Sequence, residues 1–360
     1  MADEAARAAA PREARQAVLG EVRSSLRALD LCGRRLLVAA SGGMDSTVLS
    51  HAIHALSRLE DLELGLGHVH HGLRGAESDA DADCVQALAR KLDVPYLQRR
   101  VDPRSAREGH SSRLRPTLQE AGRALRYAAL EEMAQSFGAA AILTAHHADD
   151  QAETLMLRLL RGAGPDGLGG IPERSPDGRV VRPLLRVPRE DLERYARALG
   201  LSWREDRSNR SPAYARNRLR GEWLPGLAAA FNPRLLRRLS DLAEAQRRDS
   251  EWLGTLVDAE VSQRFVLEGG GLTIDITGFR ELPEALARRL AREALRSCGA
   301  GRDVSRAHLE RMLAFLREPR AGRNVEFPRG LRLWKSGVRK CRLGRVSEAP
   351  NDGSGPRGTC

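Results

Sequence analysis

The feature that most constrains the fold of this chain is a junction between an apolar run and a helical pattern near residue 40. Residues 36–40 read Leu-Leu-Val-Ala-Ala, and such a continuous apolar run suits a β-strand buried on both faces. Residues 41–43, Ser-Gly-Gly, interrupt the run, and apolar residues then recur at helical spacing over residues 48–59. A doubly buried strand followed by a helix is the building unit of a parallel sheet with helices on both sides.

The alternation of strand and helix patterns continues along the first two thirds of the chain. This order predicts an α/β fold with a doubly wound, mostly parallel sheet. Five glycines between residues 162 and 170 predict a mobile loop rather than core. We expect further strands at 62–69, 95–101, 139–145 and 182–185, and helices at 13–30, 78–92, 117–136, from Asp149 onward and at 189–199.

The pattern changes after about residue 230, where we expect a smaller C-terminal α+β domain. The last fifteen residues are rich in Gly, Pro, Ser and Asn and predict a disordered tail. The expected domains are an N-terminal helix at 1–30, an α/β domain at 31–225, a second domain at 226–345 and the tail at 346–360. The second domain should contain a long helix from Leu235 to Val257 with a polar break at 246–249, a hairpin around 269–271, helices at 283–297 and 304–317, and a hairpin over 324–343.

The charge of the chain points to a polyanionic partner. The sequence has 59 Lys+Arg against 48 Asp+Glu, a formal charge of +11, and a basic surface attracts phosphate-rich ligands. Nearly all of the positive charge is arginine, so a compositional bias is an alternative explanation. Hydrophobic residues make up 41% of the chain, which is enough for a packed core.

Two further features bear on the compartment. The sequence contains no apolar run near the length of about eighteen residues that a membrane span needs, and its N-terminus does not resemble a signal peptide. The cysteines show neither a disulfide framework nor the C-x-x-C spacing of a zinc site. We therefore expect a cytoplasmic protein without a membrane partner. The five cysteines are Cys32, Cys84, Cys298, Cys341 and Cys360.

The strongest chemical signal is the string Ser-Gly-Gly-Met-Asp-Ser between the buried strand and the helix. Glycines let the backbone approach a ligand closely, and the following helix offers unpaired N–H groups to an anion. Asp45 can hold Mg²⁺ against a phosphate. The Walker pattern is absent, so this is not an ordinary P-loop, and a plain strand–turn–helix with a serine cap is the alternative. The predicted phosphate-binding residues are Ser41, Gly42, Gly43, Met44, Asp45 and Ser46.

Two histidine-containing segments follow strands of the expected sheet. The first contains His68, His70 and His71, for which a metal site and a site-lining segment at the end of a strand are both considered. The standard spacing of additional metal ligands is missing, which favours the second interpretation.

The second segment, His-His-Ala-Asp-Asp-Gln-Ala-Glu, begins at residue 146. On a helix that starts near Asp149, Asp150 and Glu153 lie on one face and can bind an ammonium group or a divalent metal. An acidic helix N-terminus stabilised by its dipole is the alternative. Arg126, on the preceding helix, can pair with a carboxylate through its planar guanidinium, or can belong to a solvated helix face.

Taken together, the motifs resemble those of the tRNA(Ile)-lysidine synthases, which use the phosphate loop of the N-type ATP pyrophosphatases, the PP-loop superfamily. The matching strings are SGGMDS, HVHHGLR, EAGRALRY, HHADDQAETLMLRLLRGAGPDGLGGI, RPLL and WREDRSNRSPAYARNRLR, in that order over roughly residues 30–225. The segment 230–343 resembles the first C-terminal domain of the family, and a further C-terminal domain of longer members has no counterpart. His70 and Arg207 depart from the residues common in the family.

The resemblance implies an adenine nucleotide α-hydrolase-like fold and an ATP-dependent ligase. Such an enzyme adenylates the wobble cytidine of the isoleucine tRNA with the CAU anticodon, and free L-lysine then displaces AMP to form lysidine. The domain at 31–225 would bind ATP and carry out catalysis, and the domain at 226–345 would bind tRNA. A homodimer is a possible assembly.

The resemblance also implies a role for each motif residue. The loop from Ser41 to Ser46 would hold the phosphates, and Asp45, together with Asp149, would hold Mg²⁺. Asp150 and Glu153 would bind the amino side of lysine and Arg126 its carboxylate. Arg216 and Arg220 would approach tRNA phosphates or the adenylate.

Two other functions fit parts of the sequence. A tRNA-thiolating enzyme uses the same loop, but such enzymes commonly carry paired cysteines, which are absent here. An RNA-binding protein without activity would be expected to have a damaged loop or to lack the acids, and both are intact.

Overall fold

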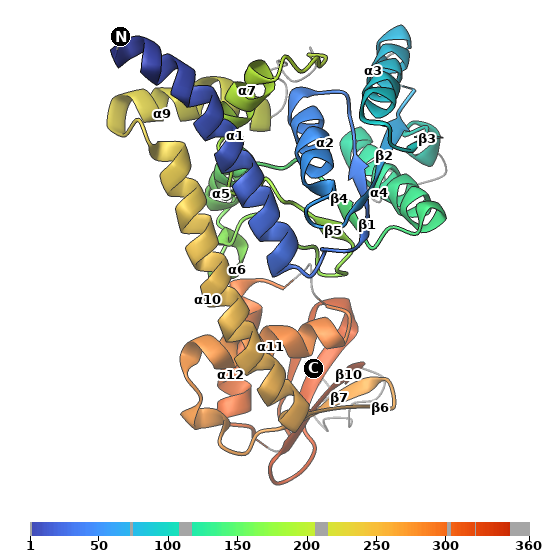
Figure 1. Ribbon diagram of the computed structural model, residues 1–360. Helices are drawn as coiled ribbons and strands as arrows, with labels where there is room; N and C mark the ends of the chain where they lie inside the picture. The colour runs from blue at the N-terminus through green and yellow to red at the C-terminus, as the bar shows by residue number, and fades with distance from the viewer. Residues whose placement is uncertain are drawn as a thin grey trace. The chain divides into compact units, whose positions relative to one another are not determined.

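The protein is described from a computed structural model (Figure 1). The structure describes residues 2–72, 75–107, 117–205, 215–300, 304–320 and 322–345. The chain divides into two compact units, Met1–Arg247 and Arg248–Cys360. This division falls inside helix α10 (Leu235–Arg264), whereas the boundary expected from the sequence falls inside α9 (Leu224–Phe231).

The first unit contains a five-stranded sheet in the order β3-β2-β1-β4-β5, and every neighbouring pair is parallel. The predicted α/β class with a parallel sheet is therefore confirmed. Its strands are β1 (Arg35–Ala39), β2 (Glu63–His70), β3 (Tyr96–Arg100), β4 (Ala141–Leu143) and β5 (Val180–Val181).

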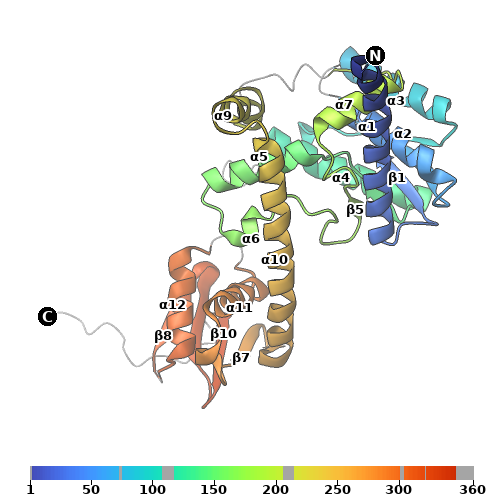
Figure 2. The same ribbon diagram turned by 60° about the vertical axis from the view of Figure 1, so that its left-hand side comes forward.

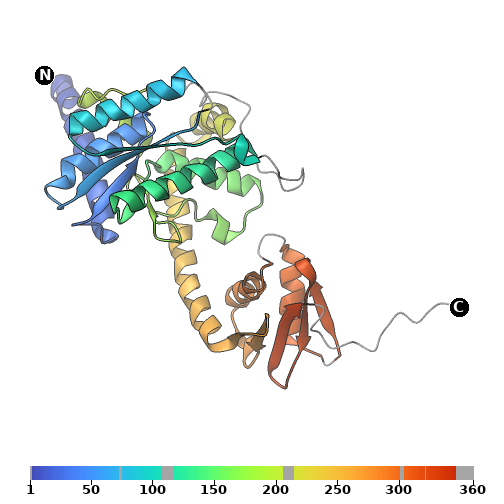
Figure 3. The same cartoon turned by 90° about the vertical axis from the view of Figure 1, so that its right-hand side faces the viewer.

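Helices cover both faces of this sheet, which explains why the strands read as continuous apolar runs. Leu36 and Val38 of β1 pack into the core with α1, α2 and α7, whereas Leu37 faces α4 on the other side. Figure 2 shows α7 beside α1, and Figure 3 shows α3 and α4 on opposite sides of the strands. The helices are α1 (Ala2–Ala28), α2 (Met44–Ser57), α3 (Ala76–Leu92), α4 (Leu118–Phe137), α5 (Ala148–Leu160), α6 (Pro165–Leu168), α7 (Arg189–Ala198) and α8 (Ala215–Arg218).

Two local expectations were wrong. The last strand is Val180–Val181 rather than 182–185, because Pro183 has no N–H to donate to a strand ladder. The glycine-rich stretch is not simply a loop outside the core. It contains α6, and the Arg158 guanidinium donates to the carbonyl oxygens of Gly167 and Gly170 at 2.8 and 2.7 Å.

The second unit contains an antiparallel sheet in the order β6-β7-β10-β9-β8, against which α11 and α12 pack. This confirms a C-terminal domain of helices and antiparallel strands. The polar break expected at 246–249 is absent, because Gln and Arg are good helix formers and α10 is continuous there. The elements are β6 (Phe265–Glu268), β7 (Gly271–Asp275), α11 (Glu284–Ser297), α12 (Arg306–Arg317), β8 (Asn324–Phe327), β9 (Leu331–Lys335) and β10 (Lys340–Arg345).

Within the described residues, no helix combines the length and the apolar character that crossing a membrane would require. The expected tail at 346–360 lies outside the described residues, as do Leu73, Arg74 and the segment 206–214 that contains Arg207.

Candidate active site

The phosphate loop follows β1 and ends at the first turn of α2. Gly42 has a φ of +84°, a left-handed conformation that favours glycine, and an added Cβ would lie 3.3 Å from the carbonyl oxygen of Asp81. The Ser46 hydroxyl donates to the Gly43 carbonyl oxygen at 3.0 Å and accepts from the Ser41 N–H at 3.1 Å. These bonds shape the loop from within.

The start of α2 is open to an anion. Gly43 is the N-cap residue, and no side chain caps the helix there, which disfavours the alternative of a serine-capped turn. Met44 contributes only its backbone, because its side chain is buried in the core. Ser41, Gly43, Asp45 and Ser46 all line one cavity.

This cavity, of about 410 Å³, lies at the carboxyl ends of β1, β2 and β4. The strand order reverses between β1 and β4, and ligands of open α/β sheets bind at such a switch point. Other residues that line the cavity are His68 near the end of β2, Arg126 of α4, His146 after β4, Asp150 of α5 and Arg216 of α8.

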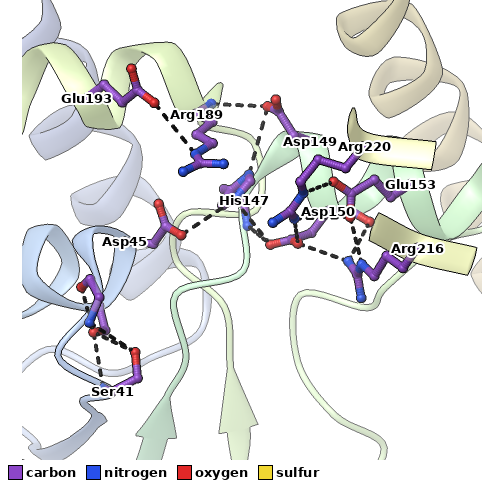
Figure 4. Close-up of polar contacts among 12 residues, drawn as sticks. Ser41, Asp45, His147, Asp149, Asp150, Glu153, Arg189, Glu193, Arg216 and Arg220 are labelled. Atoms are coloured by element: carbon purple, nitrogen blue, oxygen red, sulfur yellow. Dashed lines mark hydrogen bonds and ion pairs between the residues drawn. The ribbon is translucent and has the colours of Figure 1, made fainter. Parts of the chain in front are cut away.

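The two acids of α5 share a face, as the spacing predicted, but each is already paired with two arginines (Figure 4). Arg216 bonds Asp150 at 2.9 Å and Glu153 at 2.6 Å. Arg220 bonds Asp150 at 3.1 Å and also Glu153. The residues expected to bind lysine and those expected to approach tRNA therefore form one cluster of two negative and two positive charges.

The environment sets the ionisation of these acids. Burial alone would raise the pKa of Asp150, but the attraction of His147 and Arg216 outweighs it and lowers that pKa. For Asp45, burial dominates and raises the pKa, and His147 and Arg189 only partly oppose it. Asp45 Oδ1 is also buried without a hydrogen-bond partner.

His147 lies between three of the acids. Its Nε2 is 3.8 Å from Asp45 Oδ2 and 3.5 Å from Asp150 Oδ2, while its Nδ1 is 3.8 Å from Asp149 Oδ1 (Figure 4). Asp45 and Asp149 thus face opposite edges of one imidazole. Asp149 instead accepts a hydrogen bond from the backbone N–H of Arg189, the first residue of α7, at 3.1 Å. The structure does not bring Asp149 into the cavity beside Asp45.

Arg126 of α4 also lines the cavity. It lies over the ring of Tyr127, with 5.4 Å from the guanidinium carbon to the ring centroid. A capping box between Thr117 and Glu120 fixes the start of α4, two turns before Arg126.

The histidines of the two histidine-containing segments have different surroundings. Desolvation by burial lowers the pKa of His146 to about 4, so its imidazole is neutral at physiological pH. His70 Nε2 lies 2.9 Å from Asp79 of α3, outside the phosphate loop. Among the residues that the structure describes, no group of three or more His, Cys, Asp or Glu side chains is arranged to hold a metal ion.

Two contributors to the site, His147 and Arg204, are not predictable from the sequence motifs. The central place of His147 among the acids depends on the backbone turn into α5. Arg204 donates its backbone N–H to the Gly42 carbonyl oxygen at 2.9 Å and pairs with Asp81 at 2.8 Å. Neither link has a local sequence pattern. For Arg204, the string WREDRSN was the available signal.

Comparison with known proteins agrees with this geometry. The family model of the PP-loop domain matches residues 18–227, and that of the TilS substrate binding domain matches residues 274–339. A tRNA(Ile)-lysidine synthase from Alkalilimnicola ehrlichii is 39% identical over 322 residues, which cover 89% of this chain and 67% of the relative. The chain belongs to the tRNA(Ile)-lysidine synthase family.

Another member, from Geobacter sulfurreducens, is 39% identical over 264 residues, which cover 73% of this chain and 55% of the relative. The chain thus spans between about half and two thirds of the length of these relatives. A solved structure of the U34-tRNA thiolase NcsA from Methanococcus maripaludis, with its [4Fe-4S] cluster, matches with a TM-score of 0.50 and 16% identity. The match covers 64% of this chain and 78% of the thiolase, and at this sequence identity it supports only the similarity of the fold.

Proposed function

We propose that the protein joins L-lysine to carbon-2 of the wobble cytidine of tRNA(Ile) with the CAU anticodon, at the expense of ATP. The proposal rests on the observation that the phosphate loop, Arg126 and Asp150 all line one cavity. In the reaction, the cytidine carbonyl oxygen attacks the α-phosphate and pyrophosphate leaves. The lysine ε-amine then displaces AMP, so no covalent enzyme intermediate is needed.

The loop from Ser41 to Ser46 would bind the triphosphate. Backbone N–H groups at the start of α2 and the Ser41 hydroxyl can donate hydrogen bonds to phosphate oxygens without adding negative charge. The loop is positioned before the ligand arrives, because the Ser46 and Thr47 hydroxyls both donate to the Gly43 carbonyl oxygen.

Asp45 suits Mg²⁺. Its Oδ1 is buried without a partner, and carboxylate oxygens are preferred ligands of this ion. When bound, Mg²⁺ neutralises the charge that builds up on departing pyrophosphate. Asp150 lies at the same Nε2 edge of His147 as Asp45, which makes it a better candidate for a second metal-binding acid than Asp149, which lies at the opposite edge and accepts a hydrogen bond from the first residue of α7.

Arg126 would bind the lysine carboxylate, and Asp150 with Glu153 would bind the ammonium groups. In the structure the two acids are already neutralised by Arg216 and Arg220. For one of these acids to bind a lysine ammonium, an arginine must therefore leave that acid and pair with another anion. A tRNA phosphate is such an anion, which makes the tRNA role of Arg216 and Arg220 compatible with the lysine role of the acids.

The basic chain, the match to the substrate binding domain and the family all support tRNA as the partner. We place the protein in the cytoplasm and consider a homodimer a possible assembly. The thiolation alternative is not favoured, since none of the described cysteines lines the cavity and Cys32 donates its thiol hydrogen to Glu60.

The test is mass spectrometry of tRNA(Ile) transcript with the CAU anticodon after incubation with ATP and lysine. We expect a mass increase equal to one lysyl residue at the wobble cytidine, dependent on both ATP and lysine, together with AMP and pyrophosphate. A sulfur-dependent mass change without lysine would instead support thiolation. Unmodified tRNA under all conditions, with binding retained, would indicate a tRNA-binding protein.

A further inference from the structure

His68 stands at the end of β2 with one of its two ring nitrogens already used. Its Nδ1 is 2.9 Å from the backbone carbonyl oxygen of Ala40, the residue just before the phosphate loop. A carbonyl oxygen can only accept, so Nδ1 must carry the hydrogen. The side chain is 4% exposed, which leaves it little freedom to rotate away from this bond.

The second ring nitrogen is therefore a pure hydrogen-bond acceptor. Burial lowers the pKa of His68, so the ring is neutral at physiological pH and Nε2 carries a lone pair. Nε2 has no partner among the described residues, and it is not one of the buried polar atoms sealed from solvent. His68 lines the same cavity as Ser41, Gly43 and Ser46.

A hydrogen-bond acceptor at this position can bind only a part of the nucleotide that carries a hydrogen-bond donor. Phosphate oxygens are themselves acceptors and would be repelled by the lone pair of Nε2. The donors of ATP are the two ribose hydroxyls and the amino group of adenine. Asp150 lines the cavity from α5 and Arg126 from α4, so we assign the nucleoside to the β2 side, where His68 and Asp81 line the cavity and Asp81 is bonded to Arg204.

We propose that His68 Nε2 accepts a hydrogen bond from the nucleoside of bound ATP, either from a ribose hydroxyl or from the adenine amino group. The inference rests on the proposed use of ATP and adds a specificity-determining residue to it. His146, the other neutral histidine of the cavity, is not equivalent. Its Nδ1 bonds the Thr144 hydroxyl, which can donate or accept and so leaves the tautomer open.

Two substitutions separate the two nitrogens. His68→Asn places an amide near the position of Nδ1, so it keeps a donor for the Ala40 carbonyl but removes the acceptor. His68→Gln places an amide near the position of Nε2, so it keeps an acceptor in the cavity but loses the bond to Ala40. His54→Asn, on α2 and outside the cavity, is the matched control.

The experiment measures kcat/KM for tRNA-dependent pyrophosphate release with ATP, 2′-deoxy-ATP, 3′-deoxy-ATP and purine riboside triphosphate, which lacks the amino group. The wild type should lose about three- to tenfold with the one analogue that lacks the bonded donor. His68→Asn should lose a similar factor with ATP and no longer distinguish ATP from that analogue. His68→Gln and His54→Asn should retain the discrimination.

The inference is overturned if His68→Asn discriminates among the four nucleotides as the wild type does, or if the wild type does not distinguish ATP from any analogue. A uniform loss with all nucleotides would assign His68 to shaping the loop only, which also overturns it. Failure of the wild type to form lysidine with ATP would instead reject the proposed function, so the two failures are distinguishable.

Discussion

At the scale of the residue, a substitution of Asp45 can distinguish a role in catalysis from a role in binding ATP. The loop can hold phosphate through N–H groups and hydroxyls, whereas a carboxylate beside a triphosphate is repulsive unless a cation lies between them. Asp45→Asn keeps the size and removes the charge. We expect it to bind tRNA and ATP but to lose about 100- to 1000-fold in the rate of pyrophosphate release, measured across a Mg²⁺ titration. Near-normal turnover would leave Asp45 as a structural residue of α2.

Arg126 gives the second prediction at this scale. It lines the cavity, and its bidentate contact with a carboxylate would be worth about 1.5–3 kcal/mol. Arg126→Ala should raise the lysine concentration needed for half-maximal rate by about ten- to a hundredfold, while tRNA adenylation continues. Arg90→Ala, on α3 and away from this cavity, is the control. An unchanged lysine dependence would assign the carboxylate to another residue.

Contacts between residues that are close in the sequence could be predicted, whereas contacts between residues far apart in the sequence could not. The spacing of Asp150 and Glu153 predicted a shared helix face, and both acids do bond the same two arginines. That Arg216 and Arg220 would be those partners could not be foreseen, because the pairs are separated by 63 to 70 residues and long-range ion pairs leave no periodic pattern.

At the scale of the element, the long apolar strands and amphipathic helices were predictable, and short or marginal elements were not. The two-residue strand β5 has too few residues to show a period. The polar stretch at 246–249 lies on exposed or half-buried positions of α10, where helix propensity and not burial decides, so it did not interrupt the helix.

The attachment of α1 yields a prediction about acid stability. The buried Glu60 carboxylate accepts hydrogen bonds from Arg27 and Arg23 of α1 and from Cys32, and these bonds lower its pKa from 4.5 to about 2. A pKa depressed in the folded state contributes stability that is complete above pH 4.5 and is lost as the pH falls toward 2. The free energy of unfolding should therefore decline more steeply over this range in the wild type than in Glu60→Gln.

Urea denaturation at several pH values between 7 and 2.5 measures this difference. Glu63→Gln is a suitable control, because its partner Arg35 and its own carboxylate are both solvent-exposed and such a pair contributes little. If Glu60→Gln and the wild type lose stability in parallel below pH 4.5, the bonds to α1 do not depend on the charge of Glu60.

At the scale of the whole molecule, the strand order explains why distant motifs meet. The strings after β1, β2 and β4 are far apart in sequence, but all of these strands are parallel and end at one edge of the sheet. Three of the motifs were therefore expected at one site from topology alone. In the second unit the helices expected at 283–297 and 304–317 and the turn expected around 269–271 match α11, α12 and the β6–β7 hairpin, but the order of its sheet could not be predicted, because its short strands carry weak signals and no chemical motif.

The net charge of +11 gives a prediction for the complete chain. Neutralising a phosphate with an arginine releases a counterion, so log affinity for tRNA should fall linearly with log salt, by about 0.7 to 0.9 for each phosphate contacted.

Arg323 and Arg339 are exposed within the segment that matches the substrate binding domain. Arg323→Gln with Arg339→Gln should reduce the slope by about 1.4 to 1.8 if both contact phosphates, whereas Arg58→Gln, at the other end of the sheet from the cavity, should leave it unchanged. Fluorescence anisotropy of labelled tRNA over a salt series measures the slope. A slope near zero in the wild type would mean that the positive charge serves another purpose and that tRNA docks through uncharged contacts.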